Sequence, residues 1–153
     1  MVTTLSVPLT QPKIITRVID YNSEKTLIHK VRTEVFVHEQ KIPAHLEIDD
    51  LDNVSQHVLA TYGGHAVGAG RLTPHGRIGR VAVSRPLRRQ GVGQQIMALL
   101  LELAQRNHYR EVVLSAQHHA IAFYEKLGFE CEGEEFLEVG IWHVTMRKQM
   151  FLC

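Results

Sequence analysis

The sequence predicts an α+β domain in which helices pack on a mixed β-sheet in a three-layer arrangement. Short runs rich in valine and alanine, separated by turn residues, predict strands, whereas longer runs with apolar residues at helical spacing predict helices. In order along the chain these segments follow the succession β-α-β-β-β-α-β-α-β-β. Residues 13–150 are expected to form this single domain, and residues 1–12 are expected to form an N-terminal arm.

The first strand and the first helix are expected at residues 13–19 and 23–39. Apolar residues recur in the second segment at positions i, i+3 and i+4, as on one face of a helix. The charged residues, Arg32 among them, are expected to fall mostly on the opposite, solvated face. Asn22 or Ser23 is expected to cap this helix, because either side chain can accept a hydrogen bond from its free N–H groups.

Three antiparallel strands are expected next, since the glycine pair Gly63-Gly64 between extended runs indicates a hairpin. The strand expected at 111–116 shows no alternation, which is typical of burial on both faces. Gly128 is placed to end the helix before it in a left-handed conformation. The expected elements are strands at 55–62, 65–73 and 77–84, a helix to residue 107, a strand at 111–116, a helix at 119–128, and strands at 129–138 and 141–149.

Residues 88–95, "RRQGVGQQ", carry two closely spaced glycines between a predicted strand and a predicted helix. Gly91 and Gly93 have no Cβ, so the backbone can approach a phosphate, and the helix directs its free N–H groups at such an anion. The same glycines would also serve a simple turn. A nucleotide P-loop would need Gly-Lys-Ser/Thr and a dinucleotide fingerprint would need a third glycine, and both are missing from this stretch.

Two longer stretches carry a family resemblance. Residues 76–104, followed by residues 112–129, resemble the acetyl-CoA-binding core of the GCN5-related N-acetyltransferase (GNAT) superfamily. Arg88, Gly91 and Gly93 fill its Arg/Gln-x-x-Gly-x-Gly loop, and "AIAFYEKLGF" fills its Ala-x-x-Phe-Tyr-x-x-x-Gly-Phe pattern. "VRTEVFVHEQ" and "GIWHVTMRK" are similar to a bacterial branch of glyphosate N-acetyltransferase-like proteins. The resemblance implies the GNAT, or acyl-CoA N-acyltransferase, fold and direct transfer of an acetyl group from acetyl-CoA to the primary amine of a small molecule.

The resemblance also implies a CoA site made largely of backbone. The N–H groups of the glycine loop would bind the pyrophosphate, and the pantetheine arm would lie like an added strand against the preceding strand. Gln117 replaces an asparagine that is common at this point in the superfamily and would reach CoA with a longer side chain. The residues expected to bind CoA are Val81, Ala82, Val83, Arg88, Arg89, Gln90, Gly91, Val92, Gly93 and Gln117.

Acetyl transfer needs an acid for the departing thiolate and a base for the ammonium. Tyr124 stands at the family's usual general-acid position, and its alternative role is that of a core aromatic residue. His143 stands where the glyphosate acetyltransferase-like branch has its base, and histidine as a residue type titrates near neutral pH. Its alternative is a strand histidine bonded within the sheet, and His57, Glu39 or a chain of water molecules are rivals as base. A backbone N–H of residues 81–83 would stabilise the oxyanion.

The acceptor site is expected near Arg80, which coincides with an arginine that binds the substrate's acidic group in that branch. Val37 and Gln117 stand where the branch has further arginines, so the resemblance to an acidic-substrate site is incomplete. An acidic loop could attract a cationic amine, although such loops are more commonly just solvated. This loop contains Glu47, Asp49, Asp50 and Asp52.

Composition restricts the alternatives. The formal charge of +1 argues against a nucleic-acid partner, no apolar run is long enough to span a membrane, and the start lacks a secretory signal, so a soluble cytoplasmic protein is expected. Adjacent His118 and His119 point to different helix faces, so no metal site is expected. A homodimer is a candidate assembly, as family members are often dimers. The functional alternatives are a non-catalytic acyl-CoA sensor or interaction module, an acetyltransferase for protein or peptide amines, and a nucleotide-binding protein.

Overall fold

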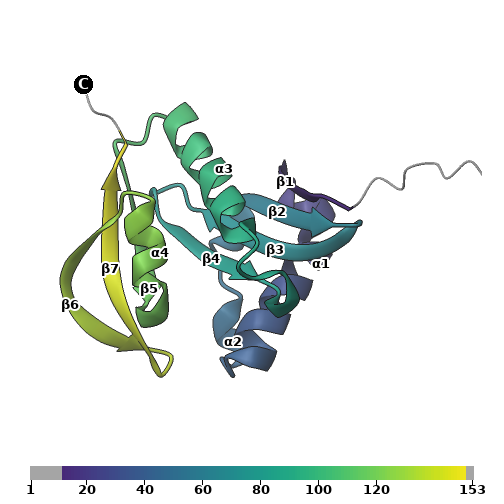
Figure 1. Ribbon diagram of the computed structural model, residues 1–153, viewed down its shortest axis with the longest axis horizontal. Helices are drawn as coiled ribbons and strands as arrows, with labels where there is room; N and C mark the ends of the chain where they lie inside the picture. The colour runs from purple at the N-terminus through teal and green to yellow at the C-terminus, as the bar shows by residue number, and fades with distance from the viewer. Residues whose placement is uncertain (1–11, 151–153) are drawn as a thin grey trace, which may run out of the picture.

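The computed structural model describes residues 12–150, so all of the expected N-terminal arm except Pro12 lies outside the described residues. The strands are β1 (Ile14–Ile19), β2 (Gln56–Tyr62), β3 (His65–Leu72), β4 (Ile78–Val83), β5 (Glu111–Gln117), β6 (Glu130–Glu138) and β7 (Ile141–Gln149). The helices are α1 (Tyr21–Arg32), a π-helix (Thr33–Glu39), α2 (Ala44–Glu47), α3 (Val92–Arg106) and α4 (Ile121–Lys126). Apart from the short α2, this order confirms the predicted succession and the α+β class (Figure 1).

The predicted single mixed sheet is divided into two antiparallel sheets, with strand orders β1-β2-β3-β4 and β5-β7-β6. They touch at one parallel bridge between Arg77 and Val113, and β4 and β5 diverge beyond it (Figure 1). Two residues of β4, Arg80 and Val81, lie opposite the single residue Gly70 of β3. This is a β-bulge, and Arg80 there has a left-handed φ of 51°. Because bulges bend a strand, the bulge directs β4 away from β5.

The burial of β5 also differs from the prediction. Val112, Leu114 and Ala116 are buried, whereas the alternate residues Ser115 and Gln117 are only half-buried. The strand was expected to be covered on both faces because it is apolar throughout. Its second face is accessible because Ser115 and Gln117 line cavities and are not covered by a packed layer.

The first helix begins and ends differently from its prediction over 23–39. Its cap is Asp20, whose Oδ2 accepts hydrogen bonds from the backbone N–H of Ser23 at 3.0 Å and from its hydroxyl at 2.7 Å. The α-helix stops at Arg32 and continues as a π-helix over Thr33–Glu39. Arg32 is 1% exposed, so its expected position on the solvated face is wrong. π-helical segments are frequent at functional sites, and this one ends beside the larger cavity described below.

The four-stranded sheet is covered on both faces. On one face α3 approaches β3 so closely that a Cβ at Gly68 or Gly70 would lie 2.7 Å from Ile96. On the other face α1 contributes the buried side chains of Ile28 and Val31. The core under α3 also includes buried residues of β5 and β7, so α3 holds the two sheets together. The loop before α3 is thereby fixed at the opening between them.

The two predicted glycine turns are confirmed. Gly63 and Gly64, both with positive φ, join β2 to β3, and Gly128 with φ of 94° follows α4. The helix predicted over 119–128 is α-helical only over Ile121–Lys126, because a 3-10 turn at His118–Ala120 precedes it. This turn brings α4 directly to the end of β5.

Candidate active site

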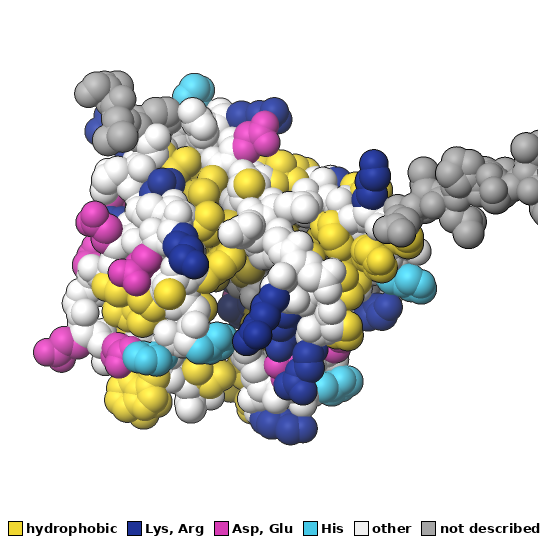
Figure 2. All heavy atoms as spheres, in the orientation of Figure 1, with side chains coloured by type: hydrophobic (Ala, Val, Ile, Leu, Met, Phe, Trp, Pro, Cys, Tyr) yellow, Lys and Arg dark blue, Asp and Glu magenta, His cyan; other side chains and the backbone are white. Residues whose placement is uncertain are grey.

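Two cavities follow one another along the opening between β4 and β5. The larger, about 1040 Å³, is lined by residues 81–83 of β4, the glycine loop and Gln117 of β5. The smaller, about 190 Å³, is lined by residues 78–80 of β4, Ser115 of β5 and His143 of β7. The linings from β4 are consecutive in sequence, and Ser115 and Gln117 are two residues apart on β5. The two cavities are therefore neighbours. Figure 2 shows the hollow between the two halves of the molecule, with basic side chains on one side of it.

The glycine loop presents the N-terminus of α3 to the larger cavity. Gly91 has φ of 82° and precedes the first residue of the 15-residue helix, and no side chain caps the free N–H groups. Arg89 also has a left-handed φ, 64°, and its side chain is exposed. Of the ten residues expected to bind CoA, only Gln90 does not line this cavity, and its side-chain amide donates to the Pro86 carbonyl instead. The geometry fits the anion site that the sequence predicts.

Arg88 is held within the protein. Its Nε donates to the Val83 carbonyl at 2.9 Å, and its two terminal nitrogens donate to the Glu39 carboxylate at 2.7 and 2.6 Å. The hydrogen bond from Arg88 is the main reason that the pKa of Glu39 lies below its ordinary value. A carboxylate held deprotonated in this way is a weaker base, which disfavours Glu39 in that role. The pair instead ties the end of the π-helix to the glycine loop.

Gln117 is oriented by a residue that sequence reasoning missed. Its amide donates to the side-chain oxygen of Gln40 at 2.9 Å, and the Gln40 amide donates back at 3.2 Å. Both residues line the larger cavity, one from the end of β5 and one just after the π-helix. The reciprocal pair fixes which end of the Gln117 amide can face a ligand. Because the partners are 77 residues apart, no local pattern in the sequence indicates this contact.

Tyr124 lies on α4 among aromatic side chains. Its ring meets those of Phe123 and Phe129 edge to face, with centroids 5.0 and 5.9 Å away. Burial raises the pKa of its phenol to about 12, so the group stays protonated at neutral pH. Phe123, and not Tyr124, lines the larger cavity. The proposed acid and the core aromatic residue thus remain the two interpretations of this position.

His143 lies in the wall of the smaller cavity, 7% exposed, with its ring stacked on Phe136. Its Nδ1 is 2.8 Å from the Ile141 carbonyl, which can only accept a hydrogen bond. The Nδ1 therefore carries the proton, and the lone pair of the neutral ring lies on Nε2. This tautomer has its basic nitrogen free for a substrate. The arrangement suits the base predicted from the sequence, and the role itself stays a prediction.

Arg80 lines the same cavity from the other sheet, at the bulge of β4. Its Nε donates to the Glu47 carbonyl at 3.0 Å, and a terminal nitrogen donates to Asp49 at 3.1 Å. The side chain is 28% exposed, so one face of the guanidinium stays open to the cavity. An acidic acceptor would have to share this guanidinium with Asp49. The predicted contact between Arg80 and substrate remains a proposal.

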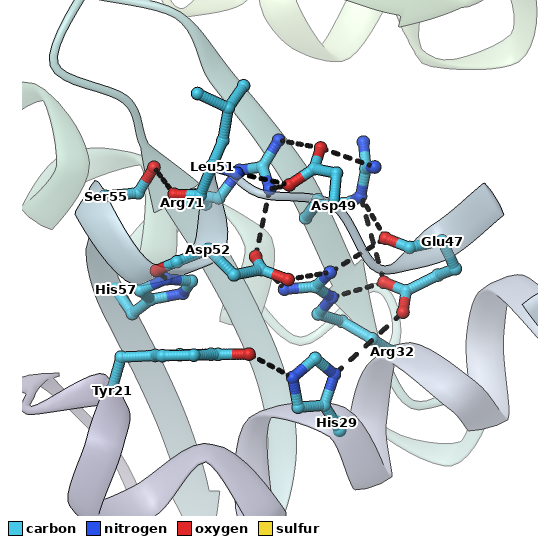
Figure 3. Close-up of polar contacts among 11 residues, drawn as sticks. Tyr21, His29, Arg32, Glu47, Asp49, Leu51, Asp52, Ser55, His57 and Arg71 are labelled. Atoms are coloured by element: carbon cyan, nitrogen blue, oxygen red, sulfur yellow. Dashed lines mark hydrogen bonds and ion pairs between the residues drawn. The ribbon is translucent and has the colours of Figure 1, made fainter. Parts of the chain in front are cut away.

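Three of the four acidic side chains of the loop, Glu47, Asp49 and Asp52, are paired with arginines, and Glu47 and Asp52 are buried, so its interpretation as a solvated loop is wrong (Figure 3). Asp52, 1% exposed, accepts hydrogen bonds from Arg32 at 2.7 and 3.0 Å and from Arg71 at 2.9 Å. Arg32 also donates to Glu47, and Arg71 also donates to Asp49 at 2.7 and 3.1 Å. Of the four acidic residues, only Asp50 is exposed. Of these paired carboxylates, Glu47 lines the smaller cavity.

His57, a rival for the base, belongs to this buried cluster and lines neither cavity. Its Nε2 donates to the Asp52 carbonyl at 2.8 Å, and its ring stacks on Tyr21 with centroids 4.5 Å apart. His29 lies on the other side of Tyr21 and contacts its hydroxyl (Figure 3). Burial lowers the pKa of both histidines, and the Arg32 charge adds to the effect. Both rings are therefore favoured in the neutral form.

The free energy of unfolding should fall as the pH drops below about 6.5, the reference histidine value. Half-buried His29 and buried His57 resist protonation, whereas the unfolded chain takes up the protons, so acid favours unfolding. Each group contributes at most about 1.4 kcal/mol per pH unit below that value. Urea unfolding at pH 7.5, 6.5 and 5.5 measures this slope, and His29→Gln should reduce it. A flat stability curve over this range would contradict the expected effect.

No group of three or more His, Cys, Asp and Glu in residues 12–150 is arranged to hold a metal ion. Within the same range, His118 is paired with Glu135 on the surface, and its neighbour His119 lines the larger cavity. Over the described part of the chain, no helix combines the length and hydropathy needed to cross a bilayer.

The free edge of β4 beside a glycine loop at the N-terminus of α3 fits a protein that binds an acyl-CoA. The chain belongs to the family described as Acetyltransferase (GNAT) domain, whose model matches residues 17–150. This confirms the predicted superfamily and makes the protein an N-acetyltransferase, in a family that uses acetyl-CoA as cosubstrate. The narrower resemblance to glyphosate N-acetyltransferase-like proteins stays a prediction.

Individual relatives agree with this assignment. The uncharacterized N-acetyltransferase YjcF of Bacillus subtilis is 42% identical over 122 residues, covering 77% of this chain and 87% of YjcF. The crystal structure of Escherichia coli ElaA is similar with a TM-score of 0.80 and 30% identity over 90% of this chain and 100% of ElaA. An acyl-CoA N-acyltransferase from Pseudomonas aeruginosa has a TM-score of 0.76 and 35% identity, covering 90% and 99% of the two chains.

Proposed function

We propose that this protein transfers the acetyl group of acetyl-CoA directly to the primary amine of a small molecule, with no covalent enzyme intermediate. The observation that carries the proposal is the succession of the two cavities along β4, which passes from one to the other between Arg80 and Val81. The larger cavity would hold CoA and the smaller the acceptor. The thioester would then lie where the two meet.

CoA binding would rest on backbone groups. The pyrophosphate would accept hydrogen bonds from the N–H groups of residues 88–93, which the left-handed residues Arg89 and Gly91 orient. The pantetheine amides would pair with residues 81–83 on the edge of β4 that β5 leaves free. Gln117, oriented by Gln40, would supply a further polar contact.

The reaction would proceed by direct attack of the acceptor amine on the thioester of acetyl-CoA. Nε2 of His143 would take a proton from the acceptor ammonium, and the freed amine nitrogen would attack the thioester carbonyl. A backbone N–H of residues 81–83 would stabilise the oxyanion of the tetrahedral intermediate. The C–S bond of this intermediate then breaks, while its new C–N bond is kept. The departing CoA thiolate takes a proton from Tyr124. The amide nitrogen gives up its second proton, which restores the Tyr124 phenol through water, so the products are the N-acetylated amine, CoA and the one proton that His143 returns to water.

The proposal is tested by acetyl-CoA binding and by turnover on a panel of primary amines. Acetyl-CoA should raise the melting temperature, whereas ATP and NAD should not, because a ligand of the native state stabilises it. At least one amine should release free CoA thiol, and His143→Ala should lower kcat about 10²- to 10⁴-fold with little change in the KM for acetyl-CoA.

A melting temperature of His143→Ala close to that of the parent protein would show that the loss is not one of folding. Binding of acetyl-CoA with no turnover on any amine would favour the acyl-CoA sensor. Stabilisation by ATP or NAD alone would overturn the assignment of the glycine loop. Turnover that survives in His143→Ala would return the base to a chain of water molecules.

A further inference from the structure

The smaller cavity contains one guanidinium that no carboxylate neutralises. Arg77 precedes β4, and its Nη2 donates to the hydroxyl of Ser115 across the opening. Its side chain is exposed and has no carboxylate within ion-pair distance among residues 12–150. Arg71 and Arg80 line the same cavity, but each of them is paired with Asp49. The charge of Arg77 is therefore the one available to a ligand.

One further hydrogen-bond donor lines the same cavity. Ser115 accepts from Arg77, so the proton of its own hydroxyl is free to be donated. A hydroxyl donor beside one uncompensated cation complements a carboxylate, which offers two acceptor oxygens and a negative charge.

The part of the cavity lined by β7 and the end of β6 suits an amine. His143 lies there with its Nε2 free, and Glu138 lines the rim, exposed and without a cation partner in the described chain. The cluster of Arg32, Arg71 and Arg80 is balanced by Glu47, Asp49 and Asp52. What remains is one positive group at Arg77 and one negative group at Glu138. This arrangement is complementary to a zwitterion.

Resting on the proposed function, we propose that the acceptor is a small amino acid or a similar zwitterion. Its carboxylate is bound by Arg77 and Ser115, near the bridge where β4 and β5 meet, and its amine lies at His143, next to the thioester. Arg77 is thus a specificity-determining residue. The cavity volume of about 190 Å³ favours small acceptors over peptides or protein tails.

The test compares amino acids with their primary carboxamides, which keep the same amine and side chain but lose the negative charge. The kcat/KM of the wild-type protein should be at least about 10-fold higher for the acids, because a charge-assisted pair is lost in the amides. Arg77→Gln should bring the two values together by raising the KM for the acids, and Arg77→Lys should give an intermediate ratio. The exposed Arg106→Gln, on the far end of α3, is the matched control and should leave the ratio unchanged.

Equal kcat/KM values for acids and amides in the wild-type protein, or an unaltered ratio in Arg77→Gln, would overturn the inference while leaving the acetyltransferase proposal intact. If no amine is acetylated, the proposed function fails, and calorimetric binding of N-acetyl amino acids decides the inference separately. Binding that exceeds that of the N-acetyl amides and is lost in Arg77→Gln would support the carboxylate site. Absence of binding would reject it. Ser115→Ala, which keeps the guanidinium, should weaken the same preference without abolishing it.

Discussion

Replacing Tyr124 by phenylalanine should lower kcat about 10²- to 10⁴-fold and leave the KM for acetyl-CoA nearly unchanged. The phenol is expected to protonate the departing thiolate, and phenylalanine keeps the ring among Phe123 and Phe129 but removes the proton. Because burial raises the pKa of Tyr124 to about 12, full transfer to a thiolate with a reference pKa of about 8.5 is roughly 5 kcal/mol uphill. The proton should therefore move only as the C–S bond breaks.

The raised pKa of Tyr124 also determines how kcat should vary with pH on the alkaline side. An acid with a pKa of about 12 stays protonated well beyond pH 9, so Tyr124 should cause no fall in rate on the alkaline side between about pH 7 and 10. Measurement of kcat by thiol release over this range checks the point, with Tyr62→Phe, on the exposed end of β2, as the control. Unchanged kcat in Tyr124→Phe would make the residue a core aromatic.

The largest effect on stability is expected for Asp52→Ala, which should lower the free energy of unfolding by about 3–5 kcal/mol. Asp52 accepts hydrogen bonds from two buried guanidinium groups, so its removal leaves Arg32 and Arg71 without that partner. Burial alone would raise the pKa of Asp52, but hydrogen bonds and charges from both arginines outweigh it and hold that pKa below its ordinary value. Urea unfolding at pH 7.5 measures the loss.

Two other variants serve as comparisons for the loss of unfolding free energy in Asp52→Ala. Glu102→Gln removes a carboxylate from an exposed i,i+4 pair on α3 and should cost no more than about 0.5 kcal/mol. Asp52→Asn keeps a side chain of the same shape with one acceptor oxygen and should fall between the two. A loss below about 1 kcal/mol in Asp52→Ala would show that water reaches the cluster and that the pairs are effectively solvated.

The parts of the fold and site that the sequence predicted depend on residues close together in the chain. Gly91 and Gly93 with the helix after them, Gly63-Gly64 and Gly128 act through their own backbone, so short patterns suffice to place them. The order of strands and helices follows from periodicity within each segment. The family resemblance used the same local motifs, which explains why the cosubstrate side of the site was the more accessible to prediction.

The parts that the sequence did not predict depend on pairing across long separations. Arg32 reaches Glu47 and Asp52, 15 and 20 residues away, so its pairing could not be predicted from the helix pattern, which placed it on the solvated face. The amide pair of Gln40 with Gln117 has no local sign at all. The division of the sheet follows from a bulge at Arg80, where an arginine, a residue type that does not favour it, adopts the left-handed φ.

The ion pair between Arg88 and Glu39 affects how CoA binding would respond to ionic strength. Since Glu39 already offsets the charge of Arg88, phosphates at the loop would meet fixed peptide dipoles and the exposed guanidinium of Arg89. Dissolved salt weakens attraction between exposed charges, but it affects hydrogen bonds at close contact much less. We therefore expect CoA to stay bound at high salt concentration through the backbone conformation of the glycine loop.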